Sequence, residues 1–240
     1  MRIQIVSHCW NYSRLLTYQL SSLALHPPEK LDVIMTVFYN EEDQRTCEVL
    51  DYFAERDVPG VTWQRWHQEK GELFRRAIGR NLAALANEVD WIWMTDCDQV
   101  FHEGCLDALA ELLPQHRDAK LLFPRLVACT SHLEEDDSLF DAVEAGPRIV
   151  DIEPRQFSPV EHFKAVGALQ IVRGDVAREV GYCKDIARFM RPARQFGRTR
   201  EDRKFRHLLG THGDPIELPG LFRIEHRPKG RRRLRPAKQL

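Results

Sequence analysis

The chain has 240 residues, 43% of them hydrophobic, and a formal net charge of −1. This is enough for one substantial core, and no run approaches the roughly 20 apolar residues that a membrane-spanning helix needs. The start, Met1-Arg2-Ile3-Gln4, does not have the pattern of a signal peptide. The six cysteines form no Cys-x-x-Cys pair, so we expect reduced thiols in a cytoplasmic protein.

The nearly neutral total conceals an uneven distribution of charge. Residues 173–240 carry 19 Lys and Arg against 8 Asp and Glu, whereas residues 1–172 carry 16 against 28. We therefore expect the C-terminal part to meet an anion, which could be nucleic acid, lipid headgroups or a charged substrate.

The first hundred residues alternate between strand and helix patterns. Apolar runs predict the strands, and spaced leucines with Pro and Gly breakers predict the helices, the first with Ser13 as its N-cap. The predicted strands are 3–7, 31–38, 61–66 and 90–94, and the predicted helices are 13–25, 43–56 and 72–86. This alternation favours an α/β fold with a Rossmann-like, mostly parallel and doubly wound sheet.

The second half continues the alternation less regularly. It predicts helices at 105–113, at 175–180 and from about residue 200, and strands at 121–127, 166–172 and 221–226. The acidic stretch 132–159 is interpreted as a solvated loop or, alternatively, as a surface excursion or lid. The Arg-rich stretch 188–200 is expected to be mobile, and the basic tail 227–240 lacks any periodic apolar pattern.

The strand predicted at 90–94 ends in two carboxylates, in the sequence Asp90-Trp91-Ile92-Trp93-Met94-Thr95-Asp96-Cys97-Asp98. Residues i and i+2 of an extended segment point the same way, so Asp96 and Asp98 can face one cation. They would lie at the sheet edge where open α/β folds bind ligands. Hard oxygen ligands suit Mg²⁺ or Mn²⁺, which often carry phosphates. Alternatively, the two residues only open a turn or cap the next helix.

Five stretches of the chain match, in order, the segments of one known family. They are IVSHCWNYSRLLTYQLSSL, FRRAIGRNLAALANEVDWIWMTDCD, GALQIVRGDVAREVGY, REDRKFRHLLG and FRIEHR. Together they cover nearly the whole chain and resemble a GT-A fold glycosyltransferase of the family 2 type. The resemblance implies one domain over 1–226, with a nucleotide-binding half at 1–100 and an acceptor half at 101–226, followed by the tail.

The resemblance also implies a nucleotide-sugar donor, expected to be a UDP-sugar. The residues expected to bind it are Ser7, Asn11, Arg75, Arg80 and Asp96. The two arginines have an alternative interpretation as solvated helix charges. One stretch departs from the family, because the turn at 38–43 lacks the Asp-rich sequence that usually contacts the nucleobase.

The expected metal ion is Mn²⁺ or Mg²⁺, with Asp98 as a direct ligand, Asp96 bound to it through water or to the ribose, and His226 as the third ligand. By the same resemblance, Asp202 is the general base that activates an acceptor hydroxyl and Glu201 supports it. A single displacement would invert the anomeric centre. The acceptor would be a glycan or a lipid-linked molecule, in keeping with a role in cell-surface glycan synthesis.

Three other interpretations compete. Asp96-Cys97-Asp98-Gln99-Val100 is similar to the nucleophile turn of haloacid-dehalogenase-type phosphatases, with Gly174-Asp175 as the nearest second metal-binding motif. A nucleotidyltransferase would carry a Gly-rich loop after its first strand, and 7–11 is not one. A binding module could use the tail on an anionic surface, although the tail has no aromatic residues for specific nucleic-acid recognition. The tail could also hold an enzyme at the inner membrane face.

Overall fold

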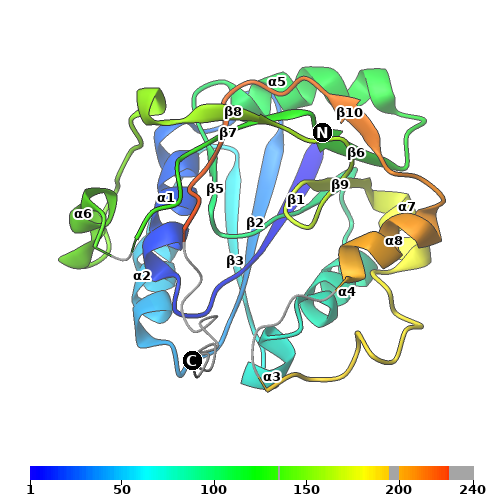
Figure 1. Ribbon diagram of the computed structural model, residues 1–240, viewed down its shortest axis with the longest axis horizontal. Helices are drawn as coiled ribbons and strands as arrows, with labels where there is room; N and C mark the ends of the chain where they lie inside the picture. The colour runs from blue at the N-terminus through cyan, green and yellow to red at the C-terminus, as the bar shows by residue number, and fades with distance from the viewer. Residues whose placement is uncertain (135, 195–199, 227–240) are drawn as a thin grey trace, which may run out of the picture.

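The computed structural model describes residues 1–134, 136–194 and 200–226 (Figure 1). Its centre is a seven-stranded sheet in the order β10-β6-β9-β4-β1-β2-β3. The strands are β1 (Arg2–His8), β2 (Asp32–Tyr39), β3 (Val61–His67), β4 (Trp91–Met94), β6 (Leu121–Pro124), β9 (Gln170–Arg173) and β10 (Asp214–Ile216). The β1–β2, β2–β3, β1–β4 and β6–β10 pairs are parallel, and β9 is antiparallel to both neighbours.

Helices lie on both sides of this sheet. Figure 1 shows α1 (Ser13–Leu25) and α2 (Gln44–Ala54) on one side, and α4 (Arg76–Ala86), α7 (Gly174–Val180) and α8 (Glu201–Leu209) on the other. The remaining helices are α3 (Lys70–Leu73), α5 (Cys105–Leu112), α6 (Asp141–Glu144), η1 (Leu113–His116), η2 (Ser138–Phe140) and η3 (Pro154–Gln156). The mostly parallel, doubly wound α/β architecture is therefore confirmed.

A smaller sheet joins the end of the described chain to its middle. It contains β5 (Gln99–Phe101), β7 (Leu126–Cys129), β8 (Ser158–Glu161) and β11 (Leu221–Arg223), in the order β5-β11-β7-β8. The last strand, β11, is antiparallel to β5 and parallel to β7. Because β5 begins directly after Asp98, this pairing brings residues near 223 to the end of β4.

The central strands are apolar because both of their faces are covered. All four residues of β4 are buried, and Trp93 is completely enclosed. Its indole Nε1 donates a hydrogen bond to the Ala168 carbonyl oxygen at 3.1 Å, so the buried polar atom is satisfied. A near-continuous apolar run of this kind is typical of a strand buried in a parallel sheet.

Three details differ from the sequence-based predictions. Ser13 is the first residue of α1, and Tyr12 holds the N-cap position without a side-chain capping bond. The helix predicted at 72–86 is divided into α3 and α4, because Arg75 leaves the helical conformation with φ −109° and ψ 76°. The strand predicted at 121–127 is two strands, β6 and β7, that belong to different sheets.

The surface excursion predicted at 132–159 is partly ordered into η2, α6, η3 and the start of β8. All six cysteines are free, as the sequence predicted, and five of them are buried. Within the described residues, no helix combines the length and hydrophobicity that crossing a membrane would require. The predictions for the basic tail 227–240, and for residues 195–199 of the Arg-rich stretch, concern positions outside the described residues.

Candidate active site

Asp96 follows β4 and lies against two arginines of α4. Its Oδ1 accepts hydrogen bonds from Arg76 Nη1 at 2.7 Å and from Arg80 Nη2 at 3.1 Å. Arg80 is completely buried, and its Nη2 also donates to the Thr95 carbonyl oxygen. Positions 76 and 80 are four residues apart, so both side chains project from the same face of the helix. Among the described residues, the Oδ2 atom of Asp96 accepts no hydrogen bond.

Electrostatics keep Asp96 ionised. Burial disfavours the charged form, but the guanidinium groups of Arg76, Arg80 and Arg223 outweigh it and hold the pKa of the carboxyl group below its usual range. The same attraction to Asp96, which exceeds the opposing effect of burial, raises the pKa of Arg76. The cluster therefore offers positive charge at the carboxyl end of β4 beside a carboxylate that does not take up a proton near neutral pH.

Asp98 is tied to the last strand of the smaller sheet. Its buried carboxylate accepts a hydrogen bond from Arg223 Nε at 3.1 Å on Oδ2, and one from Gln99 Nε2 at 3.3 Å on Oδ1. The Asp98 carbonyl oxygen accepts from the Ile224 backbone N–H at 2.9 Å. Arg223 also pairs with Glu225 at 3.0 Å. The β5–β11 register therefore places a guanidinium group next to the second carboxylate of the Asp-x-Asp sequence.

The donor types of Asp96 and Asp98 fit a hard divalent ion. Arg223 occupies Oδ2 of Asp98 and Gln99 occupies its Oδ1, whereas Oδ2 of Asp96 accepts no hydrogen bond among the described residues. His226 lies in a β-bridge with Leu133, and its ring packs edge-on against Tyr12 with 4.8 Å between centroids. Among the described residues, the only three potential ligand atoms that converge within 4.8 Å belong to another part of the molecule. His226 is thus not gathered with the two aspartates in this conformation.

A cavity of about 330 Å³ opens beside the start of α1. The residues that line it come from the turn after β1, the start of α2, the stretch 132–159 and the end of the described chain. They include Asn11, Tyr12, Asp43, Arg45, Phe140 and His226. Asn11 has a positive φ of 58°, and its backbone N–H donates to Asp43 Oδ2 at 2.6 Å. Although the turn at 38–43 departs from the family pattern, its last residue is an aspartate that reaches this cavity.

Two other predicted nucleotide-binding residues lie elsewhere. Ser7 is completely buried and donates to Gln19 Oε1 at 2.7 Å, while Gln19 Nε2 donates to the Asp96 carbonyl oxygen at 2.9 Å. Ser7 therefore supports the backbone at Asp96 and does not line the cavity. Arg75 is not among the arginines that hydrogen-bond Asp96, and its Nε donates to the Arg191 carbonyl oxygen at 3.2 Å.

Arg76 contacts Asp96 and Arg223 contacts Asp98, although neither arginine is among the site residues predicted from the sequence. The spacing of Arg76 and Arg80 was a usable signal for the first. The prediction of one continuous helix from residue 72 hides this signal, because it does not separate Arg75 from the helix that carries Arg76 and Arg80. No local signal links Arg223 to Asp98, because the two residues are 125 positions apart and come together only through the pairing of β5 with β11.

Asp202 and Glu201 occupy the first turn of α8 in different environments. Asp202 is partly exposed, and its Oδ2 accepts a hydrogen bond from Arg206 Nη1 at 3.3 Å. Glu201 is buried, and its Oε2 has no hydrogen-bond partner among the described residues. The Glu201 carboxylate also raises the pKa of Arg76. Its effect is smaller than the raising effect of Asp96 and the lowering effect of burial. Glu201 is therefore electrostatically coupled to the Asp96 cluster.

A second link to α8 passes through Tyr182. Its hydroxyl accepts a hydrogen bond from Arg80 Nη1 at 3.2 Å and donates to Gln170 Oε1 at 2.8 Å. The Tyr182 ring packs against Phe205 of α8 with 4.4 Å between centroids. The helix that carries the predicted base is thus connected to the Asp-x-Asp sequence through packed and hydrogen-bonded side chains.

Gly79 allows α4 to approach β1 closely enough to present its arginines. A Cβ atom at this position would lie 2.3 Å from His8 Nε2 and 3.0 Å from Gln68 Oε1. The His8 ring is stacked on Phe38 at 4.8 Å, and neither of its nitrogens has a partner within the described residues. Burial, with smaller effects from Arg80 and Arg76, holds the pKa of His8 well below its usual value. The imidazole is therefore neutral.

The phosphatase interpretation loses its second motif. In the antiparallel β4–β9 pair, Arg173 lies opposite Trp91, at the end of β4 remote from Asp96. Gly174 and Asp175 follow at that remote end, and Asp175 Oδ1 accepts a hydrogen bond from Arg173 Nε at 2.6 Å. These residues cannot share a metal ion with Asp96, because the length of β4 separates them.

No protein-family model matches this chain, and no curated protein matches it in sequence. Solved structures do match. S. aureus TarS 1–349 in complex with UDP-GlcNAc aligns with a TM-score of 0.55 and 12% identity over 95% of this chain and 60% of that one. Its complex with UDP gives 0.51 and 13% over 95% and 58%. The chain spans about three fifths of these structures. It has the GT-A glycosyltransferase fold, as the sequence resemblance implied.

Proposed function

We propose that this GT-A-fold chain is a glycosyltransferase that moves a sugar from a nucleoside-diphosphate donor, UDP by preference, to an acceptor hydroxyl. The observation that carries the proposal is the cluster at the carboxyl end of β4, where three arginines surround Asp96 and Asp98. Support for the donor class comes from the UDP-GlcNAc and UDP complexes of TarS, whose fold this chain shares.

The nucleoside would occupy the cavity beside α1. Tyr12 and Phe140 offer aromatic surface for a nucleobase, and Asn11 contributes a side-chain amide. Asp43 holds the Asn11 backbone in its positive-φ conformation, so the turn after β2 contributes to the cavity despite its unusual sequence. The diphosphate would then extend from this cavity toward the arginines at the end of β4.

The three arginines would stabilise the leaving group. Negative charge develops on the diphosphate as the glycosidic bond breaks, and fixed positive groups that face it lower the barrier. Arg76 and Arg80 are held in place by Asp96, and Arg223 by Asp98 and Glu225. When bound, a Mn²⁺ or Mg²⁺ ion would add further positive charge. Asp98 would hold it directly, Asp96 directly or through water, and His226 would be its third ligand.

Asp202 would serve as the base that accepts the proton of the acceptor hydroxyl. Its contact with Arg206 holds the carboxylate in a fixed position at the start of α8, where it remains partly exposed. Glu201 would support it from the buried side. A single displacement by the activated hydroxyl would invert the anomeric centre. A glycan or lipid-linked acceptor, and a role in cell-surface glycan synthesis, complete the proposal.

Binding measurements test the donor first. Calorimetry should show that UDP binds more tightly than the other nucleoside diphosphates, and that Mn²⁺ strengthens the binding. Asp98→Ala should remove the Mn²⁺-dependent part of the affinity. Equal UDP affinity with and without Mn²⁺, in both proteins, would contradict the metal role. Failure of every nucleoside diphosphate and nucleotide sugar to raise the melting temperature would contradict the donor class.

A separate measurement tests His226 as the third ligand. If it binds the metal, the loss of activity in His226→Ala should shrink as the Mn²⁺ concentration rises. A constant ratio of mutant to wild-type activity across all Mn²⁺ concentrations would remove His226 from the ligand set, while leaving the two aspartates in place.

The basic tail 227–240 suggests that the enzyme meets its acceptor at a membrane. We propose that this tail attaches the enzyme to the inner face of an anionic membrane, because clustered Arg and Lys bind such surfaces. The chain should then sediment with vesicles that contain anionic lipid, and rising salt should release it. A chain ending at residue 226 is the control. Equal sedimentation of both chains would assign the binding elsewhere.

A further inference from the structure

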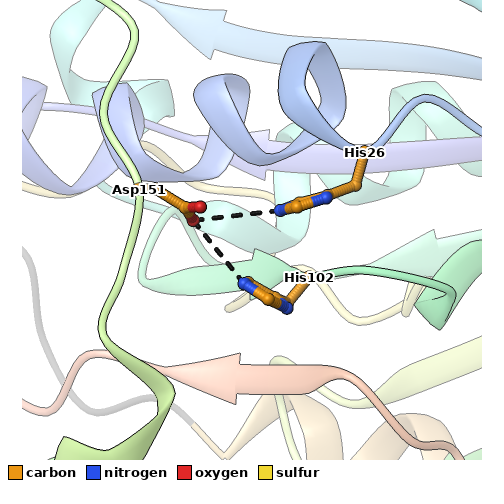
Figure 2. A group of neighbouring side chains, drawn as sticks. All are labelled: His26, His102 and Asp151. Carbon is orange, nitrogen blue, oxygen red and sulfur yellow. Dashed lines mark ion pairs between the residues drawn. The ribbon is translucent and has the colours of Figure 1, made fainter.

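Three potential metal ligands converge at the end of α1 remote from the cavity. His26 follows α1 directly, His102 follows β5, and Asp151 belongs to the segment between α6 and η3 (Figure 2). The 14 residues from Tyr12 to His26 correspond to about 20 Å of helix at 1.5 Å per residue. The group is therefore separate from the proposed donor site, and the proposed function does not use it.

The three ligand atoms face a common point. Asp151 Oδ1 lies 3.8 Å from His26 Nε2 and 3.7 Å from His102 Nε2, and all three atoms lie within 4.8 Å of one another. These separations are too long for hydrogen bonds. They are close to the spacing of roughly 3.4 Å between two ligands of a tetrahedral ion with bonds of about 2.0–2.1 Å. Figure 2 shows both imidazole rings directed toward the carboxylate.

A buried nitrogen gives an independent reason to expect a ligand. His26 Nε2 is enclosed by the protein and has no hydrogen-bond partner among the described residues. A buried polar atom left without a partner costs about 1–3 kcal/mol. Water and a metal ion are the two species small enough to satisfy it. The convergence of a second imidazole and a carboxylate favours the metal ion.

The surroundings fix the ligands in place. Asp151 Oδ1 accepts the Ile152 backbone N–H at 2.8 Å, and the His102 backbone N–H donates to the Gly220 carbonyl oxygen at 2.8 Å. The His102 ring packs edge-on against Phe222.

We propose that His26, His102 and Asp151 form a Zn²⁺ site, with His26 Nε2, His102 Nε2 and Asp151 Oδ1 as ligands and water in the fourth position. Two imidazoles and one carboxylate favour Zn²⁺ over Mg²⁺ or Mn²⁺, whose sites are built mainly from oxygen ligands. The ion would tie Asp151 to the end of α1 and to β5. It would thereby fix one end of the stretch 132–159. Leu133 and Phe140, from the other end of the same stretch, line the cavity.

The test is Zn²⁺ binding by the full chain, purified without a histidine tag and stripped with a chelator. Competition with a chromophoric chelator should give one tight equivalent in the wild type. His26→Gln and His102→Gln should each weaken that equivalent by about tenfold or more. The matched control is His116→Gln, on η1. Asp98→Asn should keep the equivalent, which separates this site from the proposed donor metal.

A second measurement identifies the ligands and guards against misfolding. Zinc X-ray absorption should reveal two imidazole ligands in the wild type. Zn²⁺ should raise the melting temperatures of the wild type and of His116→Gln, but not those of His26→Gln and His102→Gln. Comparing melting temperatures in chelator will establish that the variants fold. The proposal is overturned if the stripped wild type binds no tight Zn²⁺, or if His26→Gln and His102→Gln bind it as the wild type does.

Discussion

Arg223 and Asp98 are 125 positions apart in the sequence, yet their side chains meet at 3.1 Å between Nε and Oδ2. This contact joins the last described strand to the second carboxylate of the Asp-x-Asp sequence. Asp98 is buried, and the Arg223 guanidinium group compensates its charge. A divalent ion bound to Asp98, as we propose, would compete with Arg223 for this carboxylate.

Arg223→Met tests this competition. Without metal, the variant should lose about 1–3 kcal/mol of stability, because a buried carboxylate is left without its charged partner. Added Mn²⁺ should restore part of that loss by taking the place of the guanidinium group. Melting temperature in chelator and in Mn²⁺ measures both effects. A loss that is the same in both conditions would mean that Mn²⁺ does not reach Asp98.

Neighbouring arginines provide a matched pair for donor binding. Arg76 contacts Asp96, whereas the adjacent Arg75 contacts the Arg191 carbonyl oxygen. We expect Arg76→Gln to weaken UDP binding about tenfold or more, as loss of a charged partner of a diphosphate should. Arg75→Gln should leave the affinity within about twofold. The reverse order in calorimetry would return Arg75 to the role that the sequence resemblance gave it.

Much of the central sheet could be predicted because its signals are local. The apolar runs of β1, β2 and β4, and the breakers such as Pro59-Gly60 before β3, each fall within a few residues of one another. Of the strands that were not predicted, β5 and β10 have only three residues and β8 has four, and pairing with other strands defines all three. Of the candidate site, Asp96, Asp98 and Arg80 follow from local pattern and resemblance. The contact of Arg223 with Asp98 depends on the smaller sheet and carries no local signal.

The close packing at Gly79 leads to a third prediction. Gly79→Ala would place a methyl group 2.3 Å from His8 Nε2, so either α4 shifts away from β1 or the buried His8 ring moves. Such overpacking should cost about 1–3 kcal/mol of stability. UDP affinity should fall as well, because Arg76 and Arg80 move with the helix. Leu82→Ala, at an exposed position of the same helix, is the control. Unchanged melting temperature would mean that His8 and Gln68 reorganise freely.

The proposed base leads to the final prediction. Asp202→Asn preserves the shape of the side chain and its contact with Arg206 but removes the proton acceptor. If Asp202 acts in the transition state, turnover should fall by roughly 10²–10⁴ while UDP affinity stays nearly constant. If the carboxylate only favours the first turn of α8 and pairs with Arg206, the change should cost about 1 kcal/mol or less of stability and leave turnover largely intact.

Glu201→Gln distinguishes the two acidic residues. Glu201 is buried and coupled to Arg76, so its amide variant should change stability and donor affinity more than Asp202→Asn does. Melting temperature, UDP affinity and transfer rate measured on both variants separate a base from a supporting residue. If Asp202→Asn retains turnover within a few-fold while Glu201→Gln loses it at unchanged UDP affinity, Glu201 is the base, and its unpartnered Oε2 is the atom that takes the proton.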